Sequence, residues 1–234
     1  MPFREHIDRF IEYFQTQNKE IATLEARHIF RKVLYLIEID SMSRAAFPSI
    51  HGNKERVVAF IDTCSNWPDK DRVSAVLLKS ELADKGIRSG RLYELVNRHI
   101  DSWENGSIMP PRFTIQPEDD LTLQAVQSIM TKEENKFIDK ARYKELLYTY
   151  RNHLLHEFRE PGNGMDLKPG IRTPYYLGME EESTQRKSWE LVFPVQYLHE
   201  LCENCINGLK AYLSAENLNP YDAYKFGPMW RRFR

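Results

Sequence analysis

The sequence predicts a mainly α-helical protein, a helical bundle into which one small β-hairpin is inserted. Apolar residues recur at helical spacing along most of the 234 residues, which is typical of helices that bury one stripe. Residues 160–193 depart from this pattern, with two short β-prone segments among glycine and proline. Hydrophobic residues make up 41% of the chain and charged residues 29%, a composition that supports a packed core without disulfide or metal.

The N-terminal half is expected to contain five helices and a loop. The first helix carries an apolar stripe of Phe3, Ile7, Phe10, Ile11 and Phe14. A long helix should then run from about residue 21 to residue 47, because Pro48 stops it. Three further helices are expected over residues 54–64, 71–84 and 89–103. Residues 105–117 contain Gly106 and three prolines and are expected to form a loop.

The C-terminal half is predicted to contain three helices and the hairpin. Helix resumes near Glu118, where a cluster of acidic residues suits the positive end of a helix dipole. A second helix is expected from about Asp139 to Arg159, and a last one over residues 194–215. The hairpin strands are Pro174–Leu177 and Trp189–Phe193, with the acidic run 180–182 at the tip. The chain should therefore form one helical domain over residues 1–216, followed by an aromatic and basic arm over residues 217–234.

Charge and composition exclude several classes of function. Lysine plus arginine is 33 and aspartate plus glutamate is 34, a net charge of −1, whereas DNA coat proteins and membrane-surface proteins rely on a large one-signed field. The sequence contains no apolar run long enough for a signal peptide or a membrane span. Its three cysteines form no disulfide framework. We therefore expect a cytoplasmic protein without a membrane contact.

One helix carries residues that suit chemistry. With Tyr150 as reference and about 100° per residue, the core stripe is Tyr143, Leu146, Leu147, Tyr150, Leu154 and Phe158. The opposite side carries Tyr148, Arg151, Asn152, Leu155, His156 and Arg159. Two apolar residues among these polar ones indicate a second face that is also occupied.

Three residues of this second face could cleave a phosphodiester. Asn152 and His156 are four residues apart and can touch. The long side chain of Arg151 can reach the same volume, and a guanidinium binds phosphate through a planar fork. An imidazole can give or take a proton at physiological pH. Arg159 and Tyr148, on the same face, are expected to contact the substrate.

The run Arg151-Asn152-His153-Leu154-Leu155-His156 near a helix end resembles the HEPN superfamily, whose ribonucleases carry an Arg, a polar residue and then a histidine. The resemblance implies RNA cleavage without a metal or other cofactor, by attack of the 2′-hydroxyl on the adjacent phosphate. His156 would act as general acid or base, Arg151 would hold the phosphate and Asn152 would orient. In that family two such helices form one composite site in a homodimer, which would account for the doubly occupied helix. The hairpin insertion departs from the simplest members.

Other signals favour plainer interpretations. His153 and Glu157 are four residues apart and are expected to pair locally, although a catalytic dyad is the alternative. His199, Cys202 and Cys205 have a spacing that zinc could use, but the surrounding leucines favour core packing.

The C-terminal arm interleaves aromatic residues with cations such as Arg231 and Arg232. Such a segment either holds single-stranded RNA or docks its aromatic rings on the protein itself.

Two functions follow from these observations. The first is a homodimeric HEPN-type endoribonuclease, a toxin or defence effector. The second is a non-catalytic HEPN module that binds a nucleotide or a protein partner such as a minimal nucleotidyltransferase. In a toxin–antitoxin version of the first function, a nucleotidyltransferase-type protein would serve as the antitoxin.

Overall fold

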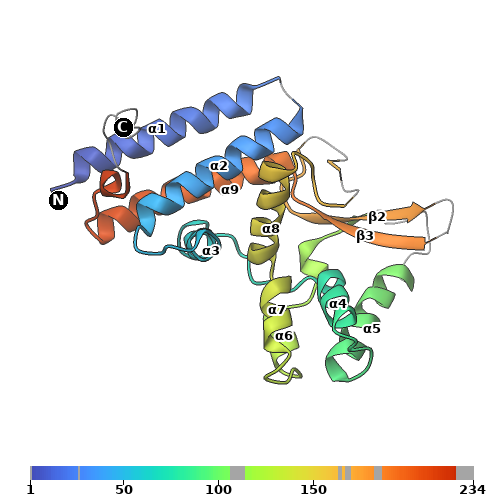
Figure 1. Cartoon of the computed structure of the whole chain (residues 1–234). Coiled ribbons are helices and arrows are strands. Elements are labelled where there is room, and N and C mark those ends of the chain that lie inside the picture. Colours follow the sequence, from blue (N-terminus) through green and yellow to red (C-terminus); the bar gives the residue numbers. More distant parts are fainter. Residues whose placement is uncertain are drawn as a thin grey trace, which may run out of the picture.

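The structure, a computed structural model, describes residues 2–25, 27–105, 114–162, 165–166, 170–181 and 186–224. It is mainly helical with a small antiparallel sheet at one end, which confirms the predicted fold class (Figure 1). The α-helices are α1 (Arg4–Thr23), α2 (His28–Ala46), α3 (Asn53–Cys64), α4 (Ala75–Asp84), α5 (Arg91–Asn105), α6 (Leu123–Gln127), α7 (Asn135–Ala141), α8 (Tyr143–His156) and α9 (Val195–Ala215). The strands are β1 (Thr114–Ile115), β2 (Tyr175–Glu181) and β3 (Arg186–Val192), and the short 3-10 helices are η1 (Pro117–Asp119) and η2 (Pro220–Ala223). Within the described ranges, no helix has the length and apolar character needed to cross a membrane.

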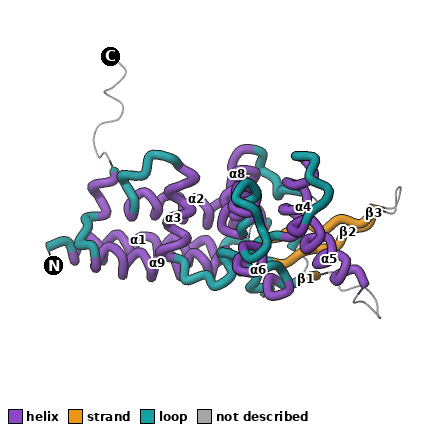
Figure 2. The backbone as a smooth tube through the Cα atoms, turned by 90° about the horizontal axis from the view of Figure 1, so that it is seen from below, coloured by secondary structure: helices purple, strands orange, loops and turns teal. Residues whose placement is uncertain are grey.

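The main core lies among α1, α2, α3, α8 and α9. Figure 2 shows α1, α2, α3 and α9 at one end of an elongated molecule and the sheet at the other, with α8 between these helices and the sheet. The predicted stripe of α1 is buried from Ile7 to Phe14, as expected. On α9, Gly208 lies so close to α3 that an added Cβ would fall on the backbone carbonyl of Cys64. Close helix packing is therefore built into this core.

A second, smaller core lies among α4, α5, α6 and α7. It is joined to the main core through the buried carboxylate of Asp120. One oxygen of Asp120 accepts hydrogen bonds from the hydroxyls of Tyr143 on α8 (3.0 Å) and Tyr176 on β2 (2.7 Å). The other accepts from the backbone N–H groups of Ala75 (3.0 Å) and Leu121 (2.8 Å). Burial raises the pKa of Asp120, and these donors partly offset that effect.

The sheet has the order β1-β2-β3. The predicted hairpin is present, with Tyr175 opposite Val192 and Tyr176 opposite Leu191. The prediction that residues 105–117 form only a loop is wrong, because β1 lies within them and pairs with β2. A two-residue strand is too short to produce a sequence pattern. Residues 180 and 181 of the acidic run belong to β2, and residue 182 lies outside the described ranges.

Two helices that the sequence predicts as continuous are broken. The chain leaves α1 through extended backbone at Leu24 and enters α2 from extended Arg27. Between α7 and α8, Arg142 is extended, because the N–H groups of Tyr143 and Lys144 bond to the carbonyls of residues 72 and 70. The helix expected to resume near Glu118 begins only at α6, after a 3-10 turn. The break at Arg142 follows from tertiary contacts that local periodicity does not contain.

Candidate functional site

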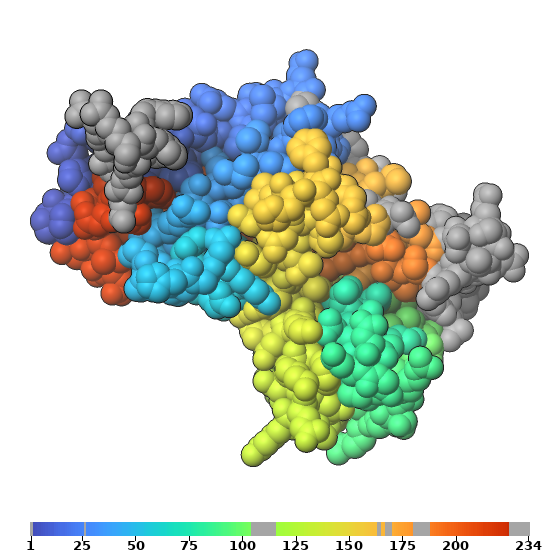
Figure 3. All heavy atoms as spheres, in the orientation of Figure 1, coloured from blue at the N-terminus to red at the C-terminus, as the bar shows by residue number. Residues whose placement is uncertain are grey.

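Helix α8 carries the predicted catalytic residues and lies at the surface between α2 and the second core (Figure 3, yellow). Its core stripe is largely as predicted, with Tyr143, Leu147, Tyr150 and Leu154 buried. The prediction for Phe158 is wrong. This residue follows the helix with a positive φ of 54°, and its side chain is exposed.

Arg151 lies against α2 and its side chain is only 11% exposed. Its Nη2 donates to Oδ2 of Asp40 at 3.0 Å, and its Nη1 donates to Oδ1 of Asn152 at 2.9 Å. The Nε atom is buried and has no hydrogen-bond partner among the described residues. The structure thus brings Arg151 and Asn152 together, and adds the carboxylate of Asp40, which no local pattern predicts.

Residues of α3 complete this cluster. Nη2 of Arg56 lies 3.7 Å from Oδ1 of Asp40, and the same guanidinium donates to the side chain of Asn53. The ring of Tyr148 lies 5.7 Å from Cζ of Arg151, and its hydroxyl accepts a long hydrogen bond (3.5 Å) from Asn53. Two guanidiniums and one carboxylate leave the cluster with one net positive charge, at the margin of the core.

The second face of α8 therefore has a partner within the same chain. From the sequence, this face is expected to contact a second copy of the chain. In the structure, Tyr148 and Arg151 instead pack on α3 and α2 of the same chain. The reason is that α3, far away in sequence, brings its polar edge to α8. This packing leaves four residues of the face at least partly exposed: Asn152, Leu155, His156 and Arg159.

His156 is the last residue of α8 and is exposed. It has no hydrogen-bond or ion-pair partner within the part of the chain that the structure describes. Arg159 follows the end of α8. Its side chain is 57% exposed and pairs with Glu157 at 2.5 Å. Among the described residues, no hydrogen bond or ion pair joins His156 to Arg151 or Asn152, so two of the three predicted residues are paired and the imidazole stands apart from them on the same helix.

An exposed aromatic pair lies just beyond the C-terminal end of α8. The rings of Phe30 on α2 and Phe158 lie 5.2 Å apart at 69°, and the residues are 46% and 52% exposed. Sequence reasoning missed this pair because Phe158 follows the helical spacing of the core stripe. Its partner comes from another helix.

A buried ion-pair network holds the segment that follows α8. Nζ of Lys32, which is completely buried, lies 2.9 Å from Oε1 of Glu160 and 2.9 Å from Oδ1 of Asp166. It also donates to the hydroxyl of Tyr150 at 3.0 Å. The other oxygen of Asp166 accepts from the first N–H of α9, at Val195. This network fixes the C-terminal end of α8 relative to α2 and α9.

The remaining sequence candidates have structural partners. His153 pairs with Glu157 at 2.9 Å, as predicted. Cys202 and Cys205 are core residues, as predicted, and His199 bonds to Asn18 at 2.7 Å. Within the described residues, no three side chains are arranged to hold a metal ion.

The C-terminal arm is described only up to residue 224. Its first part docks on the body of the protein, because Tyr221 and Tyr224 pack against Phe10 of α1. Arg231 and Arg232, predicted to bind substrate, lie outside the described residues.

Compared with models of known protein families, with curated proteins and with solved structures, the chain shows no match.

Proposed function

We propose that the C-terminal end of α8 is the catalytic element of a metal-independent endoribonuclease, completed by a second copy of the chain. The observation that carries the proposal is the Arg151–Asn152 pair and the exposed, unpaired His156 on one helix end. A cation, an amide and an imidazole are the groups that phosphodiester transesterification uses. The chain would act as a toxin or defence effector.

The reaction needs two proton transfers. The 2′-oxygen attacks phosphorus, the bond to the 5′-oxygen breaks, and a 2′,3′-cyclic phosphate and a 5′-hydroxyl result. His156 of one copy accepts the proton of the 2′-hydroxyl, and His156 of the second copy gives a proton to the leaving 5′-oxygen. Asn152 orients the phosphate, and the net positive cluster around Arg151 stabilises the charge that develops on it.

The exposed rings beyond the end of α8 suit a single-stranded substrate. Phe30 and Phe158 offer half-exposed aromatic surface at the helix end. Unpaired bases stack on such rings, each worth about 1–3 kcal/mol. Arg159 is exposed on the same segment and can contact a neighbouring phosphate.

Incubation of the full chain with single-stranded RNA in EDTA tests the proposal. We expect cleavage that leaves cyclic phosphate ends, and a loss of roughly 10²-fold or more in His156→Ala, the usual weight of a general acid or base. His153→Ala is the matched control on the same turn, because His153 is already paired with Glu157, and it should retain activity. Cleavage that requires added Mg²⁺, or that survives equally in both variants, contradicts the mechanism.

The ion pair with Asp40 favours a second candidate. It occupies Arg151 within the chain, as expected of a non-catalytic module whose exposed helix end binds a nucleotide or a protein such as a minimal nucleotidyltransferase. In that case both histidine variants are as inactive as the wild type, and Phe158→Ala weakens capture of a purified nucleotidyltransferase.

A further inference from the structure

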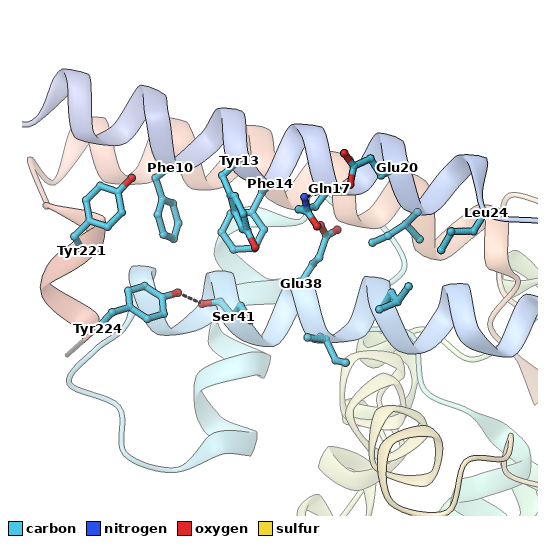
Figure 4. A pocket seen from close by; sticks show the side chains of 13 residues that line it. Phe10, Tyr13, Phe14, Gln17, Glu20, Leu24, Glu38, Ser41, Tyr221 and Tyr224 are labelled. Atoms are coloured by element: carbon cyan, nitrogen blue, oxygen red, sulfur yellow. Dashed lines mark hydrogen bonds between the residues drawn. The ribbon is translucent and has the colours of Figure 1, made fainter. Parts of the chain in front are cut away.

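A groove unrelated to α8 runs between α1 and α2 (Figure 4). Its volume is about 640 Å³, within the range of roughly 300–1,000 Å³ typical of small-molecule sites. Aromatic side chains of α1 line one wall, and Leu34 and Ile37 of α2 line the other. Tyr221 and Tyr224 of the C-terminal segment lie at one end, where the Tyr224 hydroxyl donates to the carbonyl of Ser41 at 2.7 Å.

The groove leaves apolar surface in contact with solvent. Tyr13 is 59% exposed, Ile37 43% and Leu24 42%, and all three line it. Large apolar side chains gathered along one groove mark a binding surface more often than scattered ones do.

Glu38 places an unsatisfied acceptor in this apolar groove. The residue is only 6% exposed. Its Oε2 accepts from the thiol of Cys202 on α9 at 3.1 Å, whereas its Oε1 is buried and has no hydrogen-bond partner among the described residues. Figure 4 shows the carboxyl directed from α2 into the space beside Phe14 and Gln17. A buried acceptor without a donor destabilises the folded chain, and a ligand that donates to it removes that cost.

The charged side chains that line the groove favour a positively charged ligand. Among the described residues that line it, Glu20 and Glu38 are the only charged ones. Both repel an anion, and a neutral apolar molecule leaves Oε1 of Glu38 without a donor. A cation is attracted by the carboxyls and by the faces of Tyr13, Phe14 and the other rings.

We propose that the groove between α1 and α2 binds an organic ammonium ion with an apolar tail, whose N–H donates to Oε1 of Glu38. The tail lies along Phe14, Leu34 and Ile37. This site is independent of α8 and of the proposed ribonuclease activity.

The ligand should bind more tightly as pH rises. Burial raises the pKa of Glu38 to about 7, an effect that the Cys202 hydrogen bond partly offsets. An ammonium ion prefers the ionised carboxylate, so affinity grows through this range. The other titratable or charged groups near Glu38 are Cys202 on α9, Tyr35 on α2 with its neighbours Arg31 and His199, Tyr13 and Glu20 on α1, Tyr221 on η2, and Tyr224 directly after η2.

Isothermal titration of the full chain with octylammonium chloride, octan-1-ol and sodium octanoate tests the proposal, because the three probes share one tail. We expect saturable 1:1 binding of octylammonium and no binding of octanoate. Octanol can donate its hydroxyl to Oε1 of Glu38 but carries no charge to pair with the carboxylate or the aromatic rings, so it should bind at least about tenfold more weakly. Octylammonium affinity should rise from pH 6 to pH 8. Equal binding of octylammonium and octanol overturns the proposal.

Three substitutions locate the site. Glu38→Gln keeps the side-chain shape, and should weaken octylammonium binding at least about tenfold and remove its pH dependence. Glu20→Gln, the matched control at the exposed rim, should change it less than about twofold. Ile37→Lys, at an exposed position, should abolish binding by repulsion. Unchanged affinity in Glu38→Gln contradicts the site.

The basic C-terminal residues are the competing occupant. A chain with Arg231, Arg232 and Arg234 replaced by glutamine should bind octylammonium as the wild type does. If only this variant binds the amine, the groove belongs to the chain's own C-terminal segment and the proposed ligand is wrong.

Discussion

Asp40 on α2 and Arg151 on α8 form an ion pair, 3.0 Å between Oδ2 and Nη2, across 111 residues of sequence. The pair holds the predicted phosphate-binding arginine against the body of its own chain. Asp40 is thus a positioning residue for the helix end, and it competes with any phosphate for the same guanidinium.

Replacing this carboxylate should destabilise the fold. Asp40→Asn leaves the guanidiniums of Arg56 and Arg151 without their shared anion at the margin of the core. We expect the free energy of unfolding in urea to fall by about 1–3 kcal/mol. Asp139→Asn removes a more exposed carboxylate from a 3.7 Å pair with Arg142 and should cost less than about 0.5 kcal/mol. Equal losses in the two variants would show that the Asp40 pair adds no more stability than an exposed pair.

The composite site requires a dimer through the exposed part of α8. Leu155 is half-buried among Asn152, His156 and Arg159, so Leu155→Glu should give a folded monomer without ribonuclease activity. Light scattering after gel filtration measures the oligomeric state, and circular dichroism the helix content. His153→Ala should remain dimeric. A wild type that is monomeric at micromolar concentration rules out the composite site and leaves the partner-binding alternative.

The buried cation at Lys32 should be essential for stability. Lys32→Met leaves the carboxylates of Glu160 and Asp166 beside each other without a cation from this side chain. Breaking a buried ion pair in this way typically costs about 3–5 kcal/mol. Adding Glu160→Gln to Lys32→Met should recover part of the loss, because it removes one of the two negative charges while Asp166 keeps its contact with His28. Lys19→Met, at an exposed position of α1, is the control and should leave the thermal midpoint nearly unchanged.

Glu38 should make the stability depend on pH. Burial raises its pKa from the ordinary value of 4.5 to about 7, so between these values the folded chain keeps a proton that the unfolded chain has lost. Its contribution is complete below pH 4.5 and is lost as pH rises through about 7, by at most about 3 kcal/mol. Urea titrations at pH 5 and pH 8 should show this decline relative to Glu38→Gln, which cannot ionise there. Parallel behaviour of the two chains would contradict the raised pKa.

Local periodicity was sufficient to predict most helices. The stripe of α1, the core side of α8 and the span of α9 depend on residues three and four apart, and they are as expected except at Phe158. The His153–Glu157 pair belongs to the same class, since both partners lie on one helix.

Features made by distant segments could not be predicted in this way. The break at Arg142 depends on the backbone carbonyls of residues 70 and 72. The environment of Arg151 depends on Asp40 and on α3. The exposed position of Phe158 follows from its positive φ, which helical spacing gives no sign of. The sequence could therefore indicate the candidate residues on α8, but it could not predict the residues of α2 and α3 that contact them.

The hydrogen bonds of Asp120 have a consequence for how the molecule opens. The carboxylate accepts hydrogen bonds from the second core, from α8 and from β2. The two cores therefore cannot separate without leaving this buried carboxylate short of hydrogen-bond donors. We expect a single cooperative unfolding transition, followed identically by fluorescence and circular dichroism. The amide hydrogens of Ala75 and Leu121 end on this carboxylate, and they should exchange with deuterium only when the whole chain unfolds.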